Sequence, residues 1–295
     1  MTMPRKLLVD PGVTRYYHCI SRCVRRAYLC GTDPITGYDF EHRRQWIVDR
    51  MKWLSSIFAI DICAYAVMNN HYHIVLKIDA NRAKQWSDRE VAELWTKIFA
   101  APHYIRHWLN SKTLSEDEIG IVEKKINTWR NRLYDLSWYM RCLNEAIARM
   151  ANEEDSCTGR FWEGRFKSQA LLDERALLTC MAYVDLNPVR AAIANTLDES
   201  DYTSIQQRIQ QPNDESILPF SDQTKRPNRL PYSVVDYLEL VSWAKLEILS
   251  EGKARISQEI PRVLLQFAID SQFVIGYLSK RSKKHFRAIG PWSRL

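Results

Sequence analysis

The sequence lacks a cysteine framework, a Cys-x-x-Cys pair and any long apolar run. Its seven cysteines are an odd number at irregular spacing, which argues against a disulfide-stapled secreted domain and predicts reduced thiols. Cys19, Cys23 and Cys30 follow His18 without a Cys-x-x-Cys pair, so no zinc site is expected there. Because no signal peptide or membrane-spanning stretch precedes these cysteines, we expect a cytoplasmic protein without a membrane partner.

Acidic residues are absent from the end of the chain, where basic residues gather. The 295 residues carry a formal charge of +7 and a pI near 9.0, which favours a polyanionic partner such as nucleic acid. No acidic residue follows Asp270, and the basic residues of this tail include Lys280, Arg281, Lys283 and Lys284. We predict that they contact DNA phosphates; the alternative is a solvated end without a ligand.

Two further basic stretches are candidate DNA contacts. One combines cations for phosphates with a ring for an unpaired base, and its candidates are Arg160, Trp162, Arg165 and Lys167. The alternative for this stretch is a strand that buries Phe161 and Trp162. The other stretch follows the first predicted strand and contributes Arg22, Arg25 and Arg26.

Two histidines separated by one residue, His71 and His73, lie in a predicted strand at residues 71–78. Side chains alternate along a strand, so both histidines project from one face while the apolar Ile74 and Leu76 project from the other. The apolar side is expected to enter a core and to leave the histidine side open. Two imidazoles on one face are a natural pair of metal ligands, although an ordinary surface pair is the alternative.

A predicted helix at residues 174–187, with Asp173 as its N-cap, carries a tyrosine and an asparagine on one flank. Tyr183 and Asn187 are i and i+4 neighbours, so a phenol and an amide oxygen can address one point. Alternatively, Tyr183 is an aromatic at the rim of the core, and Asn187 caps a following helix that has Pro188 at its first position.

Three motifs occur in the order found in a known family: NHYH at residues 70–73, GRFWEGRFKS at 159–168 and YVDLNPVR at 183–190. Together they resemble the single-tyrosine HUH transposases, and within these the REP-associated tyrosine transposases. The resemblance spans about residues 14–205. It implies that His71, His73 and Asn187 bind a divalent metal and that Tyr183 is the nucleophile.

The activity that the resemblance implies is metal-dependent cleavage and rejoining of single-stranded DNA at hairpin-forming palindromes, through a 5′-phosphotyrosine intermediate. The residue chemistry agrees, because cleavage by transesterification requires a nucleophile and neutralisation of the phosphoryl oxygens. Two neutral imidazoles and an amide oxygen suit an octahedral Mg²⁺ or Mn²⁺ that stays open to water and to a phosphate.

The element pattern predicts an α+β fold with a ferredoxin-like split βαβ core and an antiparallel sheet. Strands are expected at residues 14–24, 61–68, 71–78 and 159–172, with a helix at 39–58 between the first two. We expect a catalytic domain at 1–205 with a helical insertion at about 82–136, a linker at 206–232, and a helical C-terminal module with a basic tail at 233–295. The insertion is expected to be packed by Trp86, Trp95, Trp108 and Trp129.

Other functions remain open at the level of sequence. A related HUH nickase, a domesticated nucleic-acid-binding regulator without strand transfer, and a metallohydrolase that uses water are the alternatives. The chain is expected to act as a monomer or as a dimer with exchanged helices. Asp185, beside the tyrosine, is either an outer-sphere metal partner or a solvent-facing charge.

Overall fold

The computed structural model describes residues 9–24, 29–33, 35–110, 115–221, 228–249, 259–279 and 288–289. In this part of the chain, a mixed α+β fold is built on a five-stranded sheet in the order β2-β3-β1-β4-β5. Its strands are β1 (Tyr16–Arg22), β2 (Ile60–Val67), β3 (His71–Ile78), β4 (Lys167–Leu171) and β5 (Ala288–Ile289). All neighbours are antiparallel except the pair β4 and β5. The predicted α+β class with a mainly antiparallel sheet is therefore confirmed.

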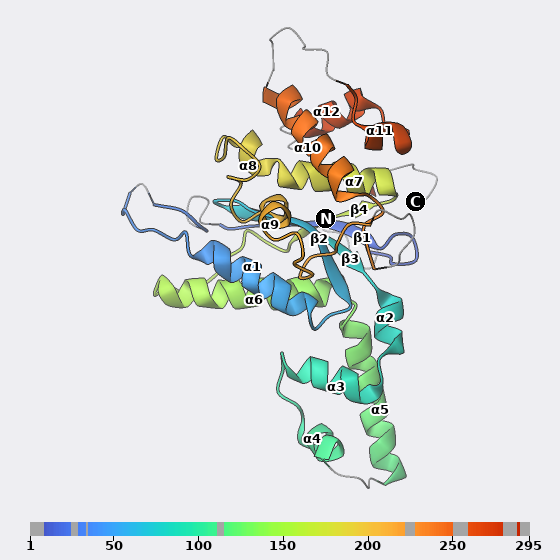
Figure 1. The fold of residues 1–295 in the computed structure, drawn as a ribbon. Coiled ribbons are helices and arrows are strands. Elements are labelled where there is room, and N and C mark those ends of the chain that lie inside the picture. Colours follow the sequence, from blue (N-terminus) through green and yellow to red (C-terminus); the bar gives the residue numbers. More distant parts are fainter. Residues whose placement is uncertain are drawn as a thin grey trace.

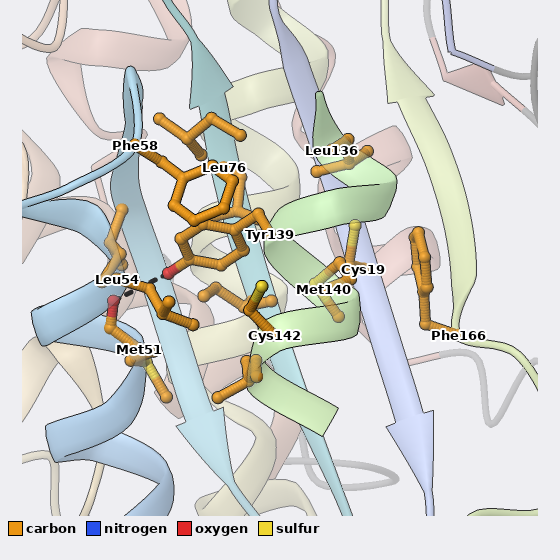
Figure 2. Packing of buried hydrophobic residues seen from close by; sticks show 14 of the residues in the cluster. Cys19, Met51, Leu54, Phe58, Leu76, Leu136, Tyr139, Met140, Cys142 and Phe166 are labelled. Atoms are coloured by element: carbon orange, nitrogen blue, oxygen red, sulfur yellow. Dashed lines mark hydrogen bonds between the residues drawn. The ribbon is translucent and has the colours of Figure 1, made fainter. Parts of the chain in front are cut away.

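Two helices cover one face of the sheet, α1 (Arg43–Ser55) and α6 (Leu136–Glu154) (Figure 1). Helix α1 presents Ile47, Met51 and Leu54 at helical spacing, so its apolar stripe packs against the sheet. In Figure 2 the Tyr139 hydroxyl of α6 donates a hydrogen bond to the Met51 carbonyl, at 2.8 Å. This contact ties the two helices together over the apolar face of β1 and β3.

The opposite face is covered by α7 (Glu174–Asp185), and Asp173 caps this helix as predicted by accepting from the Ala176 N–H. Three further helices pack beyond it (Figure 1): α10 (Val234–Leu249), α11 (Arg262–Gln266) and α12 (Ser271–Ser279). Leu177 and Val184 of α7 share one apolar core with Leu240 of α10 and Leu278 of α12. The C-terminal segment is thus built onto the tyrosine helix, and it adds β5 to the sheet.

The predicted insertion consists of helices that extend away from the sheet (Figure 1). They are α2 (Ala80–Gln85), α3 (Asp88–Thr96), α4 (His103–Asn110) and α5 (Glu116–Arg132). Helices α3 and α5 each begin with a capping box, Ser87 with Glu90 and Ser115 with Glu118. The rings of Trp95 and Trp129 are buried and stacked, with their centroids 5.7 Å apart, so these tryptophans pack the insertion.

The segment expected to be a linker, residues 206–232, is ordered against the sheet where it is described. Helix α9 (Ser204–Gln210) crosses the expected boundary at 205, and the Leu218 N–H donates to the Ile62 carbonyl of β2 at 2.7 Å. Leu218, Leu230 and Tyr232 are buried. These residues therefore pack against the sheet, although the polar, proline-rich composition of the segment is typical of a linker.

The strand expected at 159–172 is also shorter than predicted, since only Lys167–Leu171 pairs as β4. Before it, Trp162 makes a single bridge to Cys23. Within the described ranges, no helix combines the length and apolar character needed to cross a bilayer.

Candidate active site

The face of the sheet beneath α7 carries both predicted histidines. In the strand register, Arg22 of β1 lies opposite His71, and Ile20 lies between His73 on β3 and Lys167 on β4. Partners in register share a face, so His71, His73, Arg22 and Lys167 project to the same side. The ring centroids of His71 and His73 are 4.9 Å apart, so the two imidazoles are in contact.

This face is less open than expected. His73 is only 3% exposed, whereas His71 at the start of β3 is partly exposed. The reason is that α7 lies over β2 and β3 and buries the middle of the face. Alternation along β3 showed which side chains share a face, but it did not show that both faces are covered.

Tyr183 of α7 points its ring at the histidines. Its ring centroid lies 5.7 Å from that of His73 and 6.1 Å from that of His18, both in edge-to-face geometry. On its other sides, the Tyr277 ring of α12 lies at 5.5 Å and the Arg190 guanidinium at 4.6 Å. The Arg190 guanidinium thus makes a cation–π contact with the Tyr183 ring and brings a positive charge to this side of the site.

Asn187 begins the short helix α8 (Asn187–Arg190) after α7 has ended. Its Nδ2 donates to the Tyr183 carbonyl at 3.1 Å, which attaches the asparagine to the turn that carries the tyrosine. The amide nitrogen is engaged in this hydrogen bond, so Oδ1 is the atom that Asn187 can offer to a cation. The capping alternative for Asn187 is wrong, because Leu186 is the N-cap of α8, no side chain caps that helix, and Pro188 is its second residue.

One hydrogen bond of the site bears on which nitrogen of His71 carries the proton. His71 Nδ1 lies 2.5 Å from Asn70 Oδ1, an atom that only accepts, so Nδ1 carries the proton and Nε2 carries the lone pair. Among the described residues, no group of three or more His, Cys, Asp and Glu side chains is placed to hold a metal ion. The candidate donor set is instead two imidazoles and an amide oxygen, which suits Mg²⁺ or Mn²⁺ and lacks the thiolates that favour zinc.

Asp185 is neither an outer-sphere ligand nor a solvent-facing charge. It is fully buried, and its carboxylate accepts hydrogen bonds from the Ser204 hydroxyl, the Ile205 N–H and the Tyr237 hydroxyl. Asp185 therefore joins α7 to α9 and α10. Burial raises the pKa of Asp185 to about 6, while the hydrogen bonds from Ser204 and Tyr237 act in the opposite direction.

This raised pKa predicts that the protein loses stability as pH rises. In the folded protein the Asp185 carboxyl keeps its proton up to about pH 6, whereas in the unfolded protein it loses the proton near pH 3.8. The free energy of unfolding therefore falls between pH 3.8 and pH 6, by up to about 3 kcal/mol. We expect Asp185→Asn to remove this fall and to be more stable than wild type at pH 7. Urea unfolding of both proteins from pH 4 to 7 measures the difference, and identical pH profiles would contradict it.

The predicted DNA-contacting residues are placed differently by the structure. Arg22 and Lys167 are exposed beside the histidines, and Arg160 and Arg165 are exposed on the loop before β4. Trp162 is a core residue, 8% exposed, with its ring edge-to-face against Tyr72 and its N–H donated to the Asn144 carbonyl. It is therefore packed in the core and does not present an open stacking surface. The other candidates lie outside the described residues: Arg25, Arg26, Lys280, Arg281, Lys283 and Lys284.

Sequence reasoning missed four residues that touch this site: His18, Gln169, Arg190 and Tyr277. Alternation along β1 places His18 on the same face as Arg22, and Arg190 falls two helical turns after Tyr183. These signals were available in the sequence. No local pattern indicates Gln169 or Tyr277, because their positions depend on the pairing of β4 with β1 and on the docking of α12.

Of the comparisons with known proteins, only the one with solved structures finds a similar protein. No protein-family model matches the sequence, and no curated protein matches it. A solved structure of a REP-associated tyrosine transposase bound to a REP hairpin aligns with 78% of this chain and 97% of that chain, at a TM-score of 0.42 and 11% identity. At that distance, functional conclusions depend on the geometry of the site itself.

Proposed function

We propose that this protein is a metal-dependent transposase that cleaves and rejoins single-stranded DNA at hairpin-forming palindromes, with Tyr183 as nucleophile. The supporting observation is that Tyr183 lies edge-on to His73, which in turn contacts His71, on a face flanked by Arg22 and Lys167. Helix α7 thereby contributes the nucleophile and β3 contributes both imidazoles. Strands β1 and β4 each contribute one cation for a phosphate. The order of β1, α1, β2 and β3, with β3 between β1 and β2, suits the split βαβ core of HUH enzymes.

The proposed reaction is a transesterification. The Tyr183 oxygen forms a bond to phosphorus, the bond from phosphorus to the 3′ oxygen breaks, and the product is a 5′-phosphotyrosine with a free 3′-OH. The phenolic proton passes to solvent, and the departing 3′ oxygen takes up one. A bound Mg²⁺ or Mn²⁺ would supply positive charge at the phosphoryl oxygens. His71, His73 and Asn187 would hold the ion, and Arg190 would contribute a positive charge beside the Tyr183 ring.

The experiment that tests this function is capture of the covalent intermediate. We expect wild-type protein with Mg²⁺ or Mn²⁺ to become attached to single-stranded hairpin oligonucleotides labelled on the 3′ side of the cut, and peptide mapping to place the DNA on Tyr183. The released strand should end in a 3′-OH. Attachment elsewhere would overturn the assignment of the nucleophile, and DNA binding without any adduct would favour the regulator alternative.

Arg22 and Lys167 are expected to bind phosphates. Arg22→Gln and Lys167→Gln should each weaken single-strand binding and reduce the slope of log K against log salt by about 0.7, because one counterion release is lost. Arg89→Gln is the matched control, since Arg89 is exposed on α3 and pairs with Glu93 in the insertion. Fluorescence anisotropy at several salt concentrations measures the slopes. Unchanged slopes for both test variants would remove these residues from the DNA surface.

The same titration tests the basic tail by changing Lys280, Arg281, Lys283 and Lys284 to glutamine. Substitution is preferable to truncation because Ala288–Ile289, further along the chain, pairs with β4 as β5. A truncation would therefore remove part of the sheet together with the charges.

A further inference from the structure

A row of three buried, hydrogen-bonded polar side chains crosses the sheet beneath α7. Gln169 of β4, His18 of β1 and His73 of β3 are 5%, 2% and 3% exposed. His18 Nδ1 lies 3.4 Å from Gln169 Oε1, and His18 Nε2 lies 2.9 Å from His73 Nδ1. The rings of His18 and His73 are nearly parallel, with an interplanar angle of 16°. One histidine that the proposed reaction does not use is thus bonded to a histidine that it does use.

These contacts assign a tautomer to each imidazole. Gln169 Oε1 accepts hydrogen bonds, so its contact with His18 Nδ1 at 3.4 Å assigns the proton of His18 to Nδ1. In neutral His18 the other nitrogen, Nε2, then carries the lone pair, and it accepts from His73 Nδ1–H. Neutral His73 consequently carries its own lone pair on Nε2. Gln169 on β4 therefore sets which nitrogen is protonated in His18 and, through it, in His73, which lies two strands away on β3.

We propose that His18 and Gln169 are positioning residues for His73, which they hold as the Nδ1–H tautomer with Nε2 directed to a divalent cation. This inference rests on the metal site of the proposed function. Metal-bound histidines generally donate their second ring N–H to a fixed acceptor, which sets both the tautomer and the ring orientation. His71 has the corresponding acceptor in Asn70 Oδ1. Both candidate ligands therefore donate from Nδ1, His71 to Asn70 and His73 to His18.

The geometry does not support His18 as a direct ligand. Its Nδ1 faces Gln169, and its Nε2 is engaged with His73 Nδ1 at hydrogen-bond distance. Both ring nitrogens of His18 are therefore used within the sheet. Its role is to supply His73 with a hydrogen-bond acceptor at a buried position.

Nuclear magnetic resonance of ¹⁵N-labelled protein without metal tests the tautomers directly. Long-range ¹H–¹⁵N spectra are expected to show both His18 and His73 protonated on Nδ1, with resonances assigned by comparison with His18→Gln and His73→Ala. In His18→Phe, which keeps a ring but removes both nitrogens, His73 should lose its single tautomer. Wild-type His73 protonated on Nε2 would overturn the proposal.

Binding of Mn²⁺ alone, followed by electron paramagnetic resonance, tests the consequence. His18→Phe and Gln169→Leu are expected to weaken Mn²⁺ affinity by about 10–100-fold, the range typical of losing an outer partner of a metal-bound histidine. His18→Gln should recover most of the affinity, because its amide oxygen can accept from His73. His107→Phe, in the remote helix α4, is the control and should bind as wild type.

The two hypotheses fail in different ways. Wild-type Mn²⁺ affinity in His18→Phe, together with lost affinity in His73→Ala, would overturn the positioning role and leave the proposed function standing. Wild-type affinity in both His71→Ala and His73→Ala would overturn the metal site, and with it this inference. The wild-type tautomers and His18→Gln keep the proposal testable if His18→Phe does not fold.

Discussion

Tyr183→Phe is expected to lose the covalent DNA adduct completely and to cut DNA at least about 10³-fold more slowly, while its DNA affinity stays near that of wild type. Removal of one phenolic oxygen deletes the nucleophile and keeps the ring that packs against His73, Tyr277 and Arg190. The fold of α7 should therefore persist. Adduct yield on gels and affinity by anisotropy, measured on the same preparations, separate chemistry from binding.

Tyr277→Phe is the matched control for this result. Tyr277 lies 5.5 Å from Tyr183 and is itself a tyrosine beside the site, so loss of its hydroxyl tests whether any nearby phenol suffices. We expect this variant to keep forming the adduct on Tyr183. Full adduct yield in Tyr183→Phe would contradict the assignment of the nucleophile. Tyr139 could not then take its place, because its hydroxyl is buried on the other face of the sheet and donates to Met51.

His71→Ala and His73→Ala are expected to abolish Mn²⁺ binding and to slow cleavage at least about 10²-fold at a fixed metal concentration. Each variant removes one of two imidazoles that share a face of β3 and contact each other. The salt dependence of DNA binding should stay near that of wild type, because a neutral imidazole releases few counterions. Metal titration and salt titration of the same variants measure the two effects.

Lys167→Gln provides the opposite pattern as a control. Lys167 shares the face of His73 through Ile20, but its ammonium is a phosphate contact and not a metal donor. We expect it to change the salt slope and to keep Mn²⁺ affinity. If His71→Ala and His73→Ala cleave at the wild-type rate with Mg²⁺ and with Mn²⁺, the two histidines have only a structural role and the metal-dependent mechanism is wrong.

Much of the local structure follows from the sequence. Alternation along β3 places His71 and His73 on one face, the helical stripe defines α7, and Asp173 caps it. The capping boxes at Ser87 and Ser115 begin α3 and α5 as predicted. These features depend on neighbours within a few residues, where side-chain spacing and backbone hydrogen bonding are enough to decide the outcome.

Contacts with residues on distant strands and helices could not be predicted from these local patterns. Trp162 reads as a stacking residue for DNA, yet its indole is enclosed by Tyr72 and bonded to Asn144. Asp185 reads as a charge next to the metal, yet it is buried among residues of α9 and α10. In both cases the residue type suggests one environment, and long-range packing provides another.

The sequence by itself determined that His71 and His73 share one face of a strand and that Tyr183 lies on a helix, because side chains repeat every two residues along a strand and every 3.6 residues along a helix. Only the tertiary structure decided what surrounds them. It covered the histidine face with α7, placed Arg190 and Tyr277 against Tyr183, and connected Gln169 and His18 to His73. The physical reason is that burial and hydrogen-bond partners across a sheet depend on strand register and helix docking, which bring together residues as distant as His18 and Gln169.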